Sequence, residues 1–291
     1  MEANPQPDQS TYQYAPPSPP QQPSRFMYTR ATYTLMAINL LVYALMLLLD
    51  GHEPLPVGSW HHNALATLNS YLTPNIEGVY LERFANWGVV HNDQWYRAIT
   101  AAFMHLGPLH IATNMWCLWN LGLIGEPLLG YWGLIFIYLL TGLGGNILSA
   151  GAHPDIASIG ASGAVMGLAG VLVGLLRTRY LPIPAKDVRG LRRSVLLFAV
   201  LNLALTPSYN LLSGVAHWFG LHSITNMLPG TLQIDDMAHL GGFITGFILG
   251  RLLVPRIRLY RAEALRRQKI LFPAALGVLV FLAIVVTYCW R

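Results

Sequence analysis

Ser162 stands between glycines in the segment Gly160-Ala161-Ser162-Gly163, at one end of a strongly apolar stretch. A serine hydroxyl becomes a nucleophile when an imidazole accepts its proton, and His239 stands at the start of another apolar stretch. A third stretch carries His110 and Asn114, which are four residues apart and share one face of a helix. Their side chains could donate hydrogen bonds to the oxyanion of an acyl-transfer intermediate. These residue types fit serine-dependent hydrolysis.

The composition places these residues in a membrane protein. Of the 291 residues, 54% are hydrophobic and 11% are charged, whereas soluble chains carry roughly a quarter charged residues. Cys117 and Cys289 both lie in apolar runs, so we expect neither a disulfide framework nor a thiolate metal site. The histidines outside the apolar runs lack the spacing of metal ligands, so we expect no metal and no cofactor.

Seven apolar windows predict seven membrane-spanning helices, because each is close to the roughly 20 residues that cross a bilayer. They lie near residues 33–49, 108–125, 131–149, 156–176, 195–214, 237–254 and 271–289. None shows the alternation typical of barrel strands, and a helix satisfies its own backbone in lipid. No small-residue cleavage site follows the first window, so we expect a retained helix there. The predicted fold class is all-α, a polytopic membrane helical bundle.

We expect three parts along the chain. Residues 1–30 are rich in proline and glutamine and are expected to form a disordered cytoplasmic tail. Residues 31–254 contain a six-helix core with a long outer first loop at 50–107, and loops of that length are usually functional or folded. Residues 255–291 contain a basic cytoplasmic linker and the seventh helix.

The basic residues predict the orientation in the membrane. With a cytoplasmic N-terminus and an outside C-terminus, all of the 18 Lys and Arg residues except Arg83, Arg97 and Arg291 face the inside. The net charge of +5 is therefore a topology signal, and we expect no nucleic-acid partner. In this orientation the second, fourth and sixth helices run inward, which brings their polar residues to one depth below the outer surface. Ionisable groups in membranes usually face a cavity or each other.

Glycine spacing predicts that the fourth and sixth helices pack closely, because small residues four apart let two backbones approach in lipid. If these faces meet, Ser162 and His239 come within hydrogen-bonding reach. The glycines of the fourth helix are 163, 167, 170 and 174, and those of the sixth are 242, 246 and 250.

Each feature also has a non-catalytic interpretation. A Gly-x-Ser-Gly string in a helix is often a packing face, and an intramembrane histidine or asparagine is often only a structural hydrogen-bonding group. Asp235 and Asp236 could be taken for the third member of a triad, but they fit a hydrated helix N-terminus better. The soluble-hydrolase elbow Gly-x-Ser-x-Gly is excluded because residue 164 is alanine.

Two other classes of function stay open at this point. One is a membrane-embedded binding or chaperone module that uses the same groove without cutting its ligand. The other is a transporter whose polar cluster forms a proton or substrate path. Transporters often carry internal repeats, and this sequence shows none.

Several motifs occur in a familiar order between roughly residues 86 and 250. They are Gln94-Trp95-Tyr96-Arg97, His105 with His110-x-x-x-Asn114, Gly160-Ala161-Ser162-Gly163, and Ala238-His239-x-x-Gly242-x-x-x-Gly246. Together they resemble the first-loop, second-helix, nucleophile and base motifs of the rhomboid family of intramembrane serine proteases.

The resemblance implies an endopeptidase in which Ser162 is the nucleophile and His239 the general base of a dyad that forms an acyl-enzyme. It also implies that His110, Asn114 and Gly160, with the backbone N–H of Ser162, bind the oxyanion and substrate. The substrates would be single-pass membrane proteins, cut in or near the outer part of their transmembrane segment. The expected location is a bacterial inner membrane, and the oligomeric state stays open.

Two positions depart from the family pattern. Met166 stands four residues after Ser162, where many members carry an aromatic residue that packs on the base. A thioether can still contact an imidazole, so we expect an altered orientation of His239 rather than inactivity. The first-loop element reads Asn92-Asp93-Gln94, where Gly-Glu or Gly-Gln is more usual.

Overall fold

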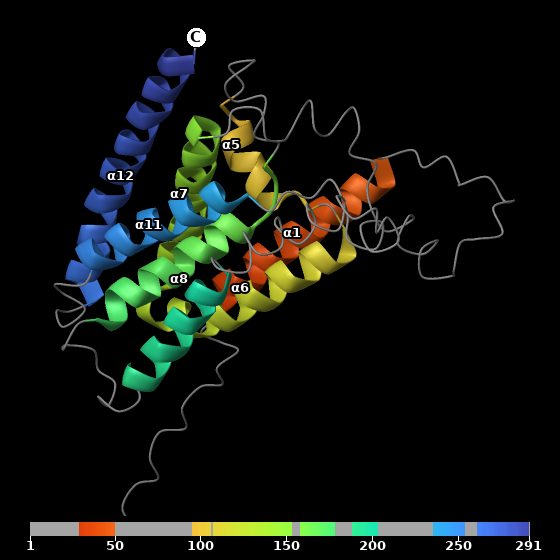
Figure 1. The fold of residues 1–291 in the computed structure, drawn as a ribbon. Helices are drawn as coiled ribbons and strands as arrows, with labels where there is room; N and C mark the ends of the chain where they lie inside the picture. The colour runs from red at the N-terminus through yellow and green to blue at the C-terminus, as the bar shows by residue number, and fades with distance from the viewer. Residues whose placement is uncertain are drawn as a thin grey trace, which may run out of the picture.

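The structure is a computed structural model. It describes residues 29–49, 95–105, 107–152, 158–177, 188–202, 235–253 and 261–290. All regular structure in these ranges is helical (Figure 1), which confirms the predicted fold class. Residues 1–28 of the expected tail and most of the first loop lie outside the described residues, as do residues 203–214 of the fifth window and residues 255–260 of the expected linker.

A helix lies in each predicted window, but two begin earlier than predicted: one at residue 188, before the window 195–214, and one at Arg261, before the window 271–289. The long ones are α1 (Arg30–Leu49), α6 (Pro108–Leu129), α7 (Tyr131–Ala152), α8 (Ser162–Leu176), α11 (Asp236–Leu253) and α12 (Arg261–Trp290). Residues 188–202 form a further helix. Two short helices, α5 (Arg97–Thr100) and η2 (Ala101–Phe103), lie in the part of the first loop that the structure describes.

The helices have the length and surface expected in lipid. Within the described ranges, α1, α7 and α12 are long and apolar enough to cross a membrane, and α8 is apolar but only 15 residues long. Large apolar side chains are exposed on the outer helices, among them Leu41 and Phe281. An apolar exterior of this extent is typical of a surface that contacts lipid, and the chain is a membrane protein.

The fourth predicted helix starts later than its apolar window. The window begins near residue 156, whereas α8 begins at Ser162. Gly160 has a φ of 128°, which lies outside the helical region and which only glycine adopts readily. Ser162 is therefore the first residue of its helix.

The centre of the bundle is α8, which packs most extensively against α11. Every residue from Gly163 to Leu176 is buried. A Cβ on Gly242 would overlap the carbonyl of Gly163, and a Cβ on Gly250 would lie 2.5 Å from the carbonyl oxygen of Val171. These contacts confirm the predicted glycine-mediated packing of the two helices.

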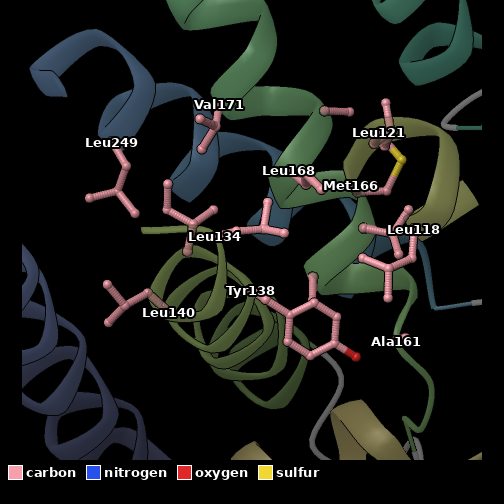
Figure 2. Close-up of a cluster of buried hydrophobic side chains, with 14 of the residues drawn as sticks. Leu118, Leu121, Leu134, Tyr138, Leu140, Ala161, Met166, Leu168, Val171 and Leu249 are labelled. Atoms are coloured by element: carbon pink, nitrogen blue, oxygen red, sulfur yellow. The ribbon is translucent and has the colours of Figure 1, made fainter. Parts of the chain in front are cut away.

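An apolar cluster fills the space between α8 and its other neighbours. Figure 2 shows side chains from four helices converging in it. Leu118 of α6, Leu134 of α7, Leu168 of α8 and Leu249 of α11 are all 3% exposed or less. This packing fixes the position of α8, and so of the residues at its start.

Glu126 near the C-terminal end of α6 accepts hydrogen bonds from the first turn of α1. Its Oε1 accepts the N–H of Ala31 at 2.8 Å, and its Oε2 accepts the N–H and the hydroxyl of Thr32 at 2.9 and 2.8 Å. The carboxylate is 3% exposed and satisfies donors that a helix start leaves without a partner in its own helix.

The variant Glu126→Ala should therefore lower the free energy of unfolding by about 1–3 kcal/mol, because buried donors lose their acceptor. Thermal unfolding in detergent micelles measures this. Asn120→Ala is the matched control on the same helix, since the exposed Asn120 side chain bonds the carbonyl of Trp116 one turn earlier. A Glu126→Ala protein that melts with the wild type would contradict the capping role.

Candidate active site

The turn before α8 brings three of the predicted site residues together. A Cβ on Gly160 would lie 2.8 Å from Nε2 of His110 and 3.7 Å from Oγ of Ser162. A side chain at residue 160 would thus overlap the imidazole of His110 and lie beside the hydroxyl of Ser162. Glycine is required there both to avoid this overlap and for the positive φ.

The backbone of this turn is held by the first loop. The N–H of Gly160 donates to the carbonyl of Ala101 at 2.8 Å, and the N–H of Ala161 donates to Nε2 of His105 at 3.5 Å. The His105 ring is fully buried and meets the ring of His110 edge-on, with centroids 5.1 Å apart. Burial and the neighbouring His110 lower the pKa of His105 to about 3, against the opposing effect of the Phe103 carbonyl. His105 is therefore neutral at neutral pH and can accept a hydrogen bond through Nε2.

The first loop is in turn fixed to the bundle by buried side chains of α1 and α7. Asn146 donates from Nδ2 to the carbonyl of Ala98 at 2.8 Å, and the hydroxyl of Tyr138 donates to the carbonyl of Ala102 at 2.9 Å. Asn39 of α1 donates to the same tyrosine hydroxyl at 3.1 Å. The partners of these three polar residues are far away in the sequence and could not be predicted from it.

His239 lies in the first turn of α11 and is 8% exposed. The preceding carbonyl, that of Ala238, lies between two helices: a Cβ on Gly145 of α7 would be 2.6 Å from its oxygen and one on Gly163 of α8 would be 3.3 Å away. Gly163 directly follows Ser162, so α8 and α11 adjoin at the positions of the proposed nucleophile and base.

Asn114 lies one turn after His110 on α6 and is 7% exposed. Its Nδ2 donates to the carbonyl of His110 at 2.9 Å. A side-chain amide has two N–H donors, so one remains for another acceptor.

Met166 is 2% exposed and belongs to the apolar core. Figure 2 shows its side chain beside Leu118 and Leu121 of α6. The thioether therefore packs between α8 and α6, one helical turn after Ser162.

The arrangement offers a hydroxyl, an imidazole and several hydrogen-bond donors at one end of three helices. Such a set can support acyl transfer through a covalent intermediate. In the part of the chain that the structure describes, no three His, Cys, Asp or Glu side chains gather as metal ligands would.

The fold and this set of residues define a polytopic helical membrane protein with a candidate serine–histidine site. Residues 92–256, more than half of the chain, match the Rhomboid domain. The chain belongs to the rhomboid family.

Relatives occur in plants and bacteria. RHOMBOID-like protein 2 of Arabidopsis thaliana is 36% identical over 168 residues, which cover 58% of this chain and 45% of that protein. RHOMBOID-like protein 6, mitochondrial, of the same plant is 32% identical over 166 residues, 57% of this chain and 46% of the relative. Rhomboid protease GluP of Bacillus subtilis (strain 168) is 28% identical over 161 residues, 55% of this chain and 26% of the relative. In each case the match spans less than half of the relative's length.

Proposed function

We propose that this protein is an intramembrane serine endopeptidase that cuts single-pass membrane proteins in or near the outer part of their transmembrane segment. Ser162 is the nucleophile and His239 the general base. The observation that carries the proposal is the turn at Gly160: a Cβ there would lie 2.8 Å from Nε2 of His110 and 3.7 Å from Oγ of Ser162, and Gly163, the residue after Ser162, contacts the helix turn that bears His239. Family membership supports it, since one relative is named a rhomboid protease.

In the proposed mechanism His239 accepts the Ser162 proton as the hydroxyl oxygen attacks the scissile carbonyl. The oxyanion that forms accepts hydrogen bonds from His110, Asn114 and the backbone N–H of Ser162, beside Gly160. His239 then gives the proton to the departing amine, and the acyl group stays on Ser162 until water hydrolyses the ester. A positioned base contributes about 10²–10⁴ in rate, and one oxyanion donor about 10²–10³.

The proposed topology explains how water reaches the site. With the N-terminus inside and the C-terminus outside, α6, α8 and α11 run inward. Ser162 is the first residue of α8 and His239 lies in the first turn of α11, so both lie near the outer surface. The proposed location is a bacterial inner membrane; one relative is named mitochondrial, and fractionation of the source cells tests the assignment.

Reconstitution tests the proposal against its rivals. The purified full chain is placed in liposomes with single-pass test substrates that carry a tag on each side of the membrane. We expect two fragments, with the cut mapped by mass spectrometry to the outer part of the transmembrane segment. A folded protein that binds these substrates without cutting any of them is a binding module. Solute flux across the liposome without cleavage indicates a transporter, and either result rejects the proposal.

Asn114→Ala should lower turnover by about 10²-fold or less, because one of several oxyanion donors is lost. Labelling by a fluorophosphonate should persist, since the nucleophile and base are retained. Thr113→Ala is the matched control, because the exposed Thr113 hydroxyl bonds only carbonyls of its own helix, those of Leu109 and His110. Unchanged turnover in Asn114→Ala would remove Asn114 from the oxyanion role.

A further inference from the structure

The carboxylate of Asp235, directly before α11, joins two helices. Its Oδ1 accepts the N–H of Ala238 at 2.9 Å, and its Oδ2 accepts a hydrogen bond from the hydroxyl of Ser149 in α7. Ser149 is fully buried and lies 86 residues away in sequence. Hydrogen bonds to a charged acceptor are shorter and stronger than neutral ones, and an acid at a helix start also complements the helix dipole.

Gly145 of α7 makes a second contact with the first turn of α11, on the same face of α7 as Ser149. Gly145 and Ser149 are four residues apart and so lie on one side of α7. Gly145 is packed against the carbonyl of Ala238, while Ser149 bonds the side chain that accepts the N–H of Ala238. Both polar groups of the Ala238 backbone are thus fixed relative to α7.

These contacts fix the backbone of Ala238, the residue directly before the proposed base. His239 follows Ala238 directly, and the Ala238 carbonyl also faces Gly163, the residue after Ser162. A small shift of this turn along α7 would move His239 relative to Ser162. Misplacing a reacting group by 1 Å can cost about 10²-fold in rate.

We propose that Asp235 is a positioning residue for His239: by joining Ser149 to the Ala238 N–H, it holds the first turn of α11 in the register that brings the base beside the nucleophile. The inference rests on the proposed function. It assigns Asp235 a role other than that of a triad carboxylate, since the hydrogen bonds that its oxygens accept come from Ser149 and the Ala238 backbone and not from the ring of His239.

Three variants distinguish the effect of the Ser149–Asp235–Ala238 hydrogen-bonded bridge from that of the Asp235 charge: Asp235→Ala, Asp235→Asn and Ser149→Ala. Asp235→Ala should lower kcat about tenfold or more and change KM by less than about twofold, because geometry at the reacting atoms is lost and substrate contacts are not. Ser149→Ala should lower kcat in the same direction. Asp235→Asn should restore most of kcat, because its amide oxygen still accepts the Ala238 N–H and its NH₂ can donate to the Ser149 hydroxyl.

Asp236→Asn is the matched control. It removes the same charge one residue later, from a side chain that makes neither of these two hydrogen bonds, and it should keep most of the wild-type kcat. An equal loss of kcat in Asp236→Asn and Asp235→Asn would show that charge matters and would overturn the bridge. Wild-type kcat in Asp235→Ala would overturn it as well.

A second variant and a parallel assay cover the case in which Asp235→Ala does not fold and separate this inference from the proposed function. If Asp235→Ala fails to fold by thermal unfolding, Ser149→Ala decides, and an unchanged kcat there rejects the bridge. The wild type and Ser162→Ala are assayed in parallel. Cleavage by the wild type alone sustains the proposed function whatever the Asp235 variants do, whereas no cleavage by the wild type rejects the proposed function and this inference together.

Discussion

Ser162→Ala should abolish both cleavage of a transmembrane test substrate and labelling by a fluorophosphonate, without affecting folding. Removing the nucleophile of a serine protease lowers turnover by about 10⁶-fold, because no acyl-enzyme can form and only the oxyanion site and substrate binding still contribute. Ser162 is the first residue of α8 and is partly exposed, so the loss of its hydroxyl leaves the core intact. Tagged-substrate cleavage in liposomes and thermal unfolding measure the two effects.

Ser194→Ala provides the matched control for the loss of a serine hydroxyl. The Ser194 side chain is exposed and donates to the carbonyl of Gly190 one turn earlier, so its removal should change neither cleavage nor labelling. Full cleavage by Ser162→Ala would contradict the assignment of the nucleophile.

Gly246→Ala should destabilise the whole bundle and with it the activity. A Cβ on Gly246 would overlap the carbonyl of Gly167 and lie 2.9 Å from its Cα. These are backbone atoms of a helix buried on all sides, and they cannot move aside as a side chain can. Overpacking a well-filled interior costs about 1–3 kcal/mol, and here it also separates the two helices that carry Ser162 and His239. Thermal unfolding and size-exclusion chromatography in detergent measure the loss.

Gly277→Ala in α12 makes the same chemical change where there is room. No atom lies within 4 Å of a Cβ at that position, so this variant should fold and cleave as the wild type does. Equal stability of Gly246→Ala and the wild type would show that α8 and α11 do not meet as the structure has them.

The helices could be predicted from the sequence because the bilayer sets their length and apolar character. The windows predicted near 108–125 and 131–149 correspond to α6 and α7. The contact of α8 with α11 could also be predicted, since glycines at a spacing of four have few uses in lipid other than close packing. Both the hydropathy windows and the glycine spacing involve residues close together in the chain, so they can be recognised in a single sequence.

The partners of buried polar residues could not be predicted, because they are brought together only by the tertiary fold. Glu126 bonds Ala31 and Thr32 across 94 residues or more, and Ser149 bonds Asp235 across 86. The start of α8 was missed for a different reason. Its preceding residues are apolar enough to extend the window, and hydropathy carries no information on the φ of Gly160. The orientation of the Met166 side chain toward α6 likewise depends on packing that a sequence window does not contain.

Mapping the fluorophosphonate adduct tests most directly whether Ser162 is the nucleophile. The purified full chain is labelled in liposomes, digested, and analysed by mass spectrometry, with Ser162→Ala and His239→Ala in parallel. We expect one adduct, on the peptide that contains Ser162, absent from Ser162→Ala and formed far more slowly in His239→Ala. An adduct on a different serine, or a wild-type protein that cleaves substrate yet takes no adduct at Ser162, would contradict the assignment of Ser162 as the nucleophile.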